Sequence, residues 1–256
     1  MALLTDGNPN DDEALRVYET EILTLAHTEG IDLPVKLGLA TEEISLELID
    51  LLLDRTRFAD PLVDRRRLIG VSDVMVTRQM KRWHALYALA LVYRDAFNNQ
   101  LNDRYQLKWE EYRSLAREAR NQVTHFGIGL VGSPLPRPTT PLFSSVAGLT
   151  PSTVYYVQVS WLNGVGQESS PSVLTTYQTA EGSKMVVEAV RPPAGATGWT
   201  VFIGITDGML TQQNLAPIGV SQAFTLPDSG LITGRAPGDG QTPDTYVTGG
   251  PVLRRA

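Results

Sequence analysis

The apolar pattern of this chain changes its period at one place, and that change limits the folds open to it. Up to about residue 128, apolar residues recur three or four positions apart, as on one face of a helix. From residue 142 onward, short runs alternate apolar and polar residues, as in strands. Between them, residues 127–141 are rich in glycine and proline, and proline removes backbone donors and fixes φ. The sequence therefore predicts an α+β chain of two domains joined by an extended connector.

The expected domains are an α-helical bundle over 1–128, a Gly/Pro-rich connector over 129–141, and an antiparallel β-sandwich over 142–256 with an extended C-terminal tail. A first helix begins near Asp11 and stops at Gly30, and Pro34 keeps the following link extended. Thr41 is expected to cap a second helix. The third and fourth helices are expected at Ser72–Asn98 and Leu101–Phe126. Residues 54–71 fit no regular element.

The expected strands are separated by clusters of Gly, Pro, Asn and Asp, which is the spacing of an antiparallel sandwich. They are Val154–Trp161, Val173–Gln178, Met185–Val190, Trp199–Ile205 and Ala223–Leu226.

Charge and composition exclude several functions. Of the 22 basic and 28 acidic residues, 16 and 21 lie in residues 1–130, so the helical half carries most of the net charge of −6. This acidic balance argues against nonspecific capture of nucleic acid. The absence of cysteine excludes disulfides and cysteine-based catalysis or zinc binding. With no signal peptide and no apolar run of membrane-spanning length, we expect a soluble protein made in the cytoplasm.

Motifs that could carry chemistry lack the surroundings their chemistry needs. Gly127-Ile-Gly-Leu-Val-Gly132 matches the dinucleotide fingerprint, but a helix precedes it and Ser-Pro follows, which favours a flexible hinge. Asp6–Asp12 places oxygen ligands at alternate positions without the glycine and glutamate of a calcium loop, which favours a solvated turn. His27, His84 and His125 are isolated along the sequence. We therefore expect no catalytic residues, no cofactor and no metal, and a protein that is not an enzyme.

The candidate functional residues are instead interface residues. Leu130 and Val131, with Leu135 and Arg137, form an apolar, proline-stiffened segment that would dock at little entropic cost. Tyr156 points away from the face shared by its neighbours on a strand and is a further candidate. Arg65, Arg66 and Arg67 have two interpretations: a solvated link paired with nearby Asp60 and Asp64, or a patch that faces an acidic partner or DNA.

The strand sequences carry a resemblance to a known family. Leu149, Pro151, Tyr155, Val157 and Val159, followed by Asn163-Gly-Val-Gly166, resemble the last strand pair of a fibronectin type III domain, an Ig-like sandwich. The resemblance places the tyrosine corner of that family at Tyr155. The following segments, Lys184–Val190 and Gly198–Gly204, look like the earlier strands of the family, so the strand order is permuted.

The helical segments resemble another family. Trp83-His-Ala-Leu-Tyr-Ala-Leu-Ala-Leu-Val-Tyr-Arg-Asp-Ala-Phe, Trp109-Glu-Glu-Tyr-Arg-Ser-Leu-Ala and Pro134-Leu-Pro-Arg-Pro look like the head–tail connector (adaptor or neck) proteins of tailed bacteriophages. The strand Gly198–Gly204 and the segment Gly234–Asp244 also look like the sandwiches of phage neck and baseplate proteins.

These resemblances imply a structural virion protein at the head–tail junction. It would form a homo-oligomeric ring, commonly twelve-fold in such proteins, beneath the portal, and would join the capsid vertex to tail, neck or fibre proteins. DNA would pass through its channel without specific binding, and no membrane would be involved. The alternative is a fibronectin-bearing binding module that recognises a glycan, a host surface or a tail fibre from an oligomerising helical base.

Overall fold

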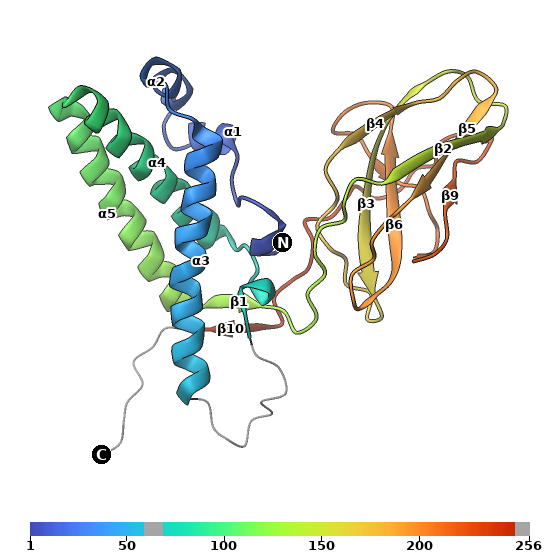
Figure 1. Cartoon of the computed structure of the whole chain (residues 1–256). Coiled ribbons are helices and arrows are strands. Elements are labelled where there is room, and N and C mark those ends of the chain that lie inside the picture. Colours follow the sequence, from blue (N-terminus) through green and yellow to red (C-terminus); the bar gives the residue numbers. More distant parts are fainter. Residues whose placement is uncertain (59–68, 249–256) are drawn as a thin grey trace. The chain divides into compact units, whose positions relative to one another are not determined.

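The computed structural model describes residues 1–58 and 69–248, which form two compact units. The helical unit comprises Gly7–Gly132 and the segment that starts at Pro243, whereas the sandwich unit comprises Met1–Asp6 and Ser133–Thr242. The chain therefore passes between the units three times, after Asp6, Gly132 and Thr242. The α+β class is as predicted: helices first, then antiparallel sheets (Figure 1).

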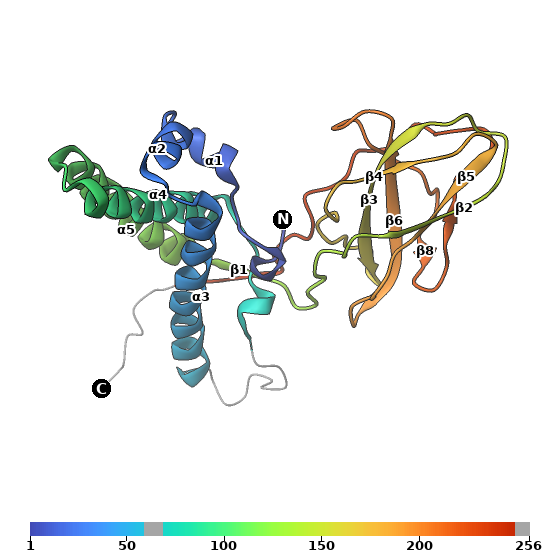
Figure 2. The same cartoon turned by 45° about the horizontal axis from the view of Figure 1, so that its top comes forward.

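The helices of the described ranges are the 3₁₀ turn η1 (Leu4–Asp6) in the sandwich unit and, in the helical unit, α1 (Asp12–Arg16), α2 (Ile22–Glu29), α3 (Leu33–Phe58), the 3₁₀ turn η2 (Val71–Asp73), α4 (Arg78–Gln100) and α5 (Asp103–Phe126). Helices α4 and α5 form a hairpin, and α3 packs on α4 (Figures 1 and 2). The hairpin turns at Leu101, whose φ of 51° is left-handed, and Asn102 then caps α5 by accepting a hydrogen bond from the Arg104 N–H. The central helix α4 is buried on most of its surface.

Local capping explains where the helical predictions were wrong. The segment from Asp11 to Glu29 is two helices, α1 and α2. Thr41 lies inside α3 because that helix starts eight residues earlier, at Leu33. Pro34 occupies the first turn, where an N–H is not required, and Asp32 accepts a hydrogen bond from the Val35 N–H at 3.1 Å. Gly30 does end α2, in a left-handed conformation.

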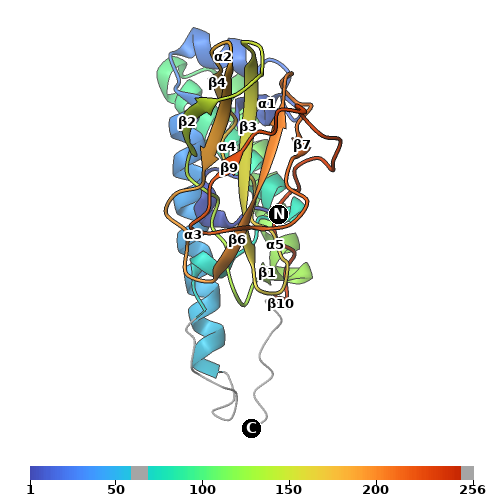
Figure 3. The ribbon, with the colours of Figure 1, turned by 90° about the vertical axis from the view of Figure 1, so that its right-hand side faces the viewer.

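The strands are β1 (Ile128–Leu130), β2 (Leu142–Ala147), β3 (Val154–Asn163), β4 (Thr175–Gln178), β5 (Ser183–Glu188), β6 (Ala196–Gly204), β7 (Thr211–Gln212), β8 (Ile218–Gly219), β9 (Phe224–Thr225) and β10 (Thr245–Val247). One sheet has the order β2-β5-β9; the other has β4-β3-β6-β7, with β8 also on β6. Figure 3 shows β3 and β6 side by side, in an antiparallel register that pairs Trp161 with Trp199. Apolar side chains between the two sheets form the core of the sandwich, and both of these tryptophans are buried in it.

The predicted connector does not exist as a separate segment. Residues 129–132 belong to the helical unit, where β1 lies between residues 73–75 and β10. Residues from Ser133 belong to the sandwich unit. The tail expected to extend from the sandwich instead re-enters the helical unit, where Ile128 pairs with Val247 and Leu130 with Thr245. The domain boundaries therefore differ from 1–128 and 142–256 at both ends of the chain.

Candidate assembly surfaces

The predicted interface segment is buried within the protein. Leu130 and Val131 are 3% and 2% exposed in the helical unit, and Leu135 is 1% exposed in the core of the sandwich. Their burial follows from pairing: β1 has a neighbour on each edge, and the Leu135 N–H donates to Gln241 Oε1 at 2.7 Å. The prediction that these residues form an exposed docking segment is therefore wrong.

Of the remaining predicted interface residues, the structure describes two, Arg137 and Tyr156, and both belong to the sandwich unit. Arg137 is exposed, and its backbone N–H donates to Asp6 Oδ1 at 2.7 Å. Tyr156 is half-buried in β3, paired with Thr176 on one side and Gly204 on the other. Arg65, Arg66 and Arg67 lie outside the described residues.

A surface that the sequence analysis missed lies on α3. This helix buries one apolar row against α4, and it exposes a second, which we call the outer stripe: Val35, Leu39, Leu46 and Ile49. The spacing of 4, 7 and 3 residues keeps the four side chains on one face. At 3.6 residues per turn this face is roughly opposite the buried row of Leu37, Ile44 and Leu48. A helix with two opposed apolar faces needs a partner on each.

The outer stripe has an acidic border. Glu42 lies within the stripe, and Glu43 and Asp50 follow its edge; all three are exposed. An acidic apolar face of this kind accepts a partner that offers positive charge together with apolar surface.

Helix α5 carries the complementary surface, which we call the basic ridge: Arg113, Arg117 and Arg120. The spacing of four and three residues places them on one face. Arg120 already contacts Glu47 of α3. Arg113 and Arg117 are exposed and have no ion-pair partner among the described residues. Arginine stems can cover apolar side chains while their guanidinium groups meet carboxylates.

A polar cluster joins the start of the chain to α4 and α5. The Tyr112 hydroxyl donates to Glu19 Oε2 at 2.8 Å, Lys108 Nζ lies 3.2 Å from the same oxygen, and the rings of Tyr93 and Tyr112 stack at 5.5 Å. Partial burial opposes ionisation of Glu19, but the hydrogen bonds from Tyr112 and Lys108 outweigh it and lower its pKa. Burial, reinforced by this carboxylate, raises the pKa of Tyr112 and of Tyr93.

A pocket of 260 Å³ opens beside this cluster, lined also by Arg104 and Tyr105. At neutral pH the phenols stay protonated, and the Glu19 carboxylate is already engaged by a donor and a cation. The arrangement therefore holds the segment between α1 and α2 against α5.

His84 is fully buried in α4 and belongs to a second polar network. Its Nδ1 lies 3.0 Å from Asn10 Nδ2, and its Nε2 lies 3.0 Å from both the Leu37 carbonyl and Thr41 Oγ1. The amide of Asn10 can only donate at Nδ2, so the neutral tautomer with hydrogen on Nε2 satisfies the contacts. Burial lowers the pKa of His84 to about 4, against a smaller opposing effect of the Leu37 carbonyl.

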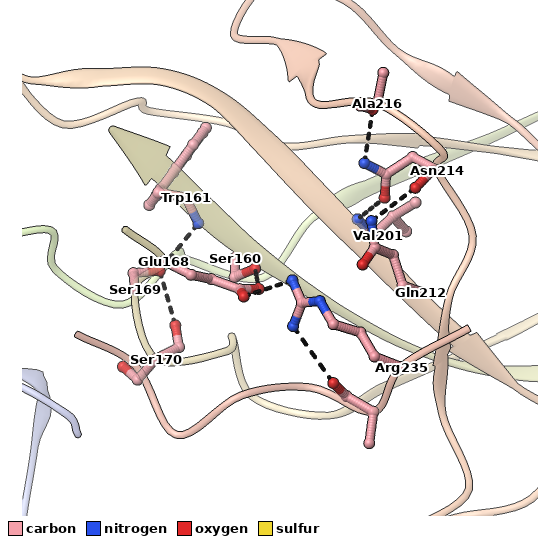
Figure 4. Close-up of polar contacts among 11 residues, drawn as sticks. Ser160, Trp161, Glu168, Ser169, Ser170, Val201, Gln212, Asn214, Ala216 and Arg235 are labelled. Atoms are coloured by element: carbon pink, nitrogen blue, oxygen red, sulfur yellow. Dashed lines mark hydrogen bonds and ion pairs between the residues drawn. The ribbon is translucent and has the colours of Figure 1, made fainter. Parts of the chain in front are cut away.

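The sandwich has its own polar cluster on the β3–β6 face opposite the core (Figure 4). Ser160 donates to Glu168, whose other oxygen lies 2.6 Å from Arg235 Nη2, and the Arg235 guanidinium stands 5.2 Å from the centre of the buried Phe202 ring. Asn214 Oδ1 accepts from the Val201 N–H at 3.0 Å. These contacts attach the loops that cover this face.

No known protein family, characterised protein or solved structure matches the sequence or the fold. In the described part of the chain, no helix is both long and apolar enough to span a membrane, and no three acidic or histidine side chains gather in a way that could hold a metal ion.

Proposed function

We propose that this chain is a structural virion protein, a head–tail connector that assembles into a homo-oligomeric ring beneath the portal of a tailed bacteriophage. The ring would join the capsid vertex to the tail and would line the DNA channel. The observation that carries the proposal is a pair of exposed surfaces in the helical unit. One is the outer stripe of α3, and the other is the part of the basic ridge of α5, Arg113 and Arg117, that has no ion-pair partner among the described residues.

The two surfaces favour a ring over a two-fold dimer. If two outer stripes met each other, Glu42, Glu43 and Asp50 would face their own copies, and like charges would repel. When the outer stripe meets the basic ridge of the next copy, the acidic border meets Arg113 and Arg117. Such a contact is heterologous, and repeated heterologous contacts close into a ring when the rotation divides a full turn.

The charge balance fits a channel wall. The helical part holds more acidic than basic residues, so a wall built from it would repel rather than retain the phosphates of passing DNA.

We propose further that the sandwich is a permuted fibronectin type III-like domain. In Ig-like sandwiches, strands C, F and G lie side by side, and strand C carries a buried tryptophan. The neighbours β6-β3-β4 fit that order with β3 and β4 as the last strand pair, and Trp199 on β6 is buried. The protein differs from the fibronectin pattern at the tyrosine corner, because the Tyr155 hydroxyl makes no hydrogen bond to any described residue.

The test of the ring is a change on the outer stripe. Leu46→Glu is expected to abolish assembly because it replaces an apolar side chain, which the arginine stems of the next copy would cover, with a carboxylate that would lose its hydration in the contact. Leu46 is 63% exposed, so the fold should be unaffected. The matched control is Leu107→Glu on α5, where the leucine is 68% exposed and lies off the basic ridge. Mass photometry and electron microscopy, with and without a portal ring, measure assembly.

A charge exchange sharpens this test. Glu43→Arg and Arg117→Glu should each weaken assembly, and the double variant should restore it. Electron microscopy of virions should then show the helical units around the channel. Rings formed by the Leu46→Glu variant at wild-type yield, or virions with the helical units outside the neck, would contradict the proposal.

A further inference from the structure

Strand β2 forms an open edge of the sandwich. It is the outermost strand of the β2-β5-β9 sheet, and its hydrogen-bonded partner is β5. On its other edge, no backbone hydrogen bond to any part of the described chain occurs between Leu142 and Ala147. An edge of this kind presents free N–H and C=O groups that can pair with a further strand.

This edge lacks the features that normally keep edge strands apart. Residues 139–149, Thr-Thr-Pro-Leu-Phe-Ser-Ser-Val-Ala-Gly-Leu, contain no charged side chain, and the pairing of β2 with β5 is continuous, without a bulge. Leu142 and Val146 are 58% and 45% exposed. Natural edge strands carry charges, internal prolines or bulges to prevent pairing with other chains. The composition of β2 therefore favours pairing of its open edge with a strand of another chain.

The sequence of β2 is complementary to itself in one antiparallel register. Leu142, Ser144 and Val146 point to the outer face of the sheet. Phe143 points inward, where its ring stacks on Tyr177 at 5.0 Å. When two copies pair about a two-fold axis through Ser144, Leu142 of each faces Val146 of the other, and Ser144 faces Ser144. An axis through Ser145 would instead place Ser144 opposite Val146. The register centred on Ser144 is the one that sets both outer apolar residues, Leu142 and Val146, opposite apolar residues within the paired segment.

We propose that β2 is a self-association strand that pairs with β2 of a second copy of this chain in the register centred on Ser144. The pairing joins two three-stranded sheets into one of six strands. The absence of charge removes repulsion between the identical edges. The five residue pairs of this register, formed by residues 142–146 of each copy, bury less surface than a stable dimer needs, so the contact is weak between free copies. It becomes effective where other contacts already hold copies together.

The chain holds no cysteine, so a single Ser144→Cys substitution gives a clean cross-linking probe. Directly opposed Cα atoms in an antiparallel pair lie roughly 4.5–5.5 Å apart, within disulfide reach. The matched control is Ser145→Cys, which is also exposed but lies diagonal to its copy at about 7–8 Å. Under mild oxidation, Ser144→Cys is expected to form covalent dimers at least tenfold faster than Ser145→Cys. Equal rates, or a faster Ser145→Cys, would overturn the proposal.

A second variant tests the apolar pairs. Val146→Lys, added to Ser144→Cys, should reduce dimer formation to the Ser145→Cys rate, because the lysine faces Leu142 of the second copy. Val173→Lys, at a 62% exposed position outside β2, is the control and should leave dimer formation unchanged. Circular dichroism of each variant checks the fold. The Leu46→Glu variant leaves β2 intact, so in that background Ser144→Cys should still form dimers faster than Ser145→Cys, although both rates fall without the ring. Failure of the ring and failure of the β2 pairing therefore give different results. Undiminished cross-linking in Val146→Lys would refute the pairing.

Discussion

Among the buried polar side chains of the helical unit, His84 is the one whose charge state bears most on stability. Both of its ring nitrogens have partners that suit the neutral form. A proton on Nδ1 would face the amide hydrogens of Asn10, so the protonated form would lose a hydrogen bond as well as its hydration. The network connects α4 to α3 and to the segment before α1.

The expected result is a loss of stability in mildly acidic solution. The folded-state pKa of His84, about 4, lies below the unfolded value of 6.5. Between these values the unfolded chain binds the proton and the folded chain does not, so stability falls as pH falls through this window. The contribution is on the order of 3 kcal/mol. Urea unfolding followed by circular dichroism between pH 7 and 4 measures it.

His84→Gln should be less stable at pH 7 and should lose most of the slope above the range where carboxyl groups titrate. His125→Gln, at an exposed position near the end of α5, is the control and should keep the wild-type slope. A wild-type slope in His84→Gln would show that another group is responsible.

At the scale of elements, the pairing of β10 with β1 depends on Gly129, which has no side chain. A Cβ added to Gly129 would stand 2.8 Å from Pro243 Cγ and 3.1 Å from Pro243 Cβ. The glycine in the middle of β1 thus allows the returning chain to approach closely before it pairs through β10. Two glycines of the Gly-x-Gly-x-x-Gly motif therefore have structural roles within the helical unit: Gly129 admits Pro243, and Gly127 ends α5 with a φ of 103°.

Gly129→Ala should release β10 from β1, because the proline ring cannot yield while the chain pairs. Amide hydrogen exchange should then accelerate in residues 243–247 while α4 and α5 keep their protection. Gly132→Ala is the matched control, since its added Cβ would meet only Asp244 Oδ2 at 3.5 Å. Equal exchange in the two variants would contradict the role of close approach.

Sequence patterns predicted most of the regular elements. The strand predictions at Val154–Trp161 and Trp199–Ile205 overlap β3 and β6. They succeed because alternating apolar and polar residues are typical of a strand that packs one face against a core. Strand β2 was missed because five of its six residues are exposed and the sixth, Phe143, is only half-buried, so the alternation of apolar and polar residues is weak. The prediction of an exposed interface segment was wrong for a different reason. Leu130 and Val131 form an apolar run beside prolines, and their burial depends on pairing with β10, which is more than 100 residues away in the sequence. The spacing of apolar residues along a segment does not indicate which strand far away in the sequence will pair with it.

At the scale of the whole molecule, each terminal segment belongs to the unit built mainly from the other part of the sequence. Asp6 shows this at one residue: its Oδ1 accepts from the Arg137 N–H, and its Oδ2 accepts from the Leu3 N–H and the Ser170 hydroxyl at 2.9 Å. A cut within residues 127–141 would leave both fragments carrying a piece of the other unit. Release of two independent domains by proteolysis there is therefore not expected.

Asp6→Ala should destabilise the sandwich unit, although the mutation lies near the start of a largely helical segment. Loss of these hydrogen bonds is expected to cost about 1–3 kcal/mol. Hydrogen exchange should rise in residues 133–242 and stay unchanged in α4 and α5. Asp11→Ala is the matched control: Asp11 caps α1 through the Ala14 N–H, so its effect should appear in the helical unit. Faster exchange confined to the helices in Asp6→Ala would contradict the assignment of the units.

Because each unit contains segments from both halves of the sequence, the order of synthesis determines when each unit can finish folding. A ribosome adds about 5–20 residues per second. The interval between synthesis of the first six residues and synthesis of the sandwich strands is therefore on the order of tens of seconds or less. The helices are synthesised early, yet β1 gains its outer neighbour only when residue 247 has emerged. The sandwich unit is complete only when Thr242 has been synthesised, and β1 is paired with β10 only when Val247 has been synthesised. During that interval the edge of β1 that pairs with β10 is open, and nascent chains should bind chaperones most strongly at residues 128–130.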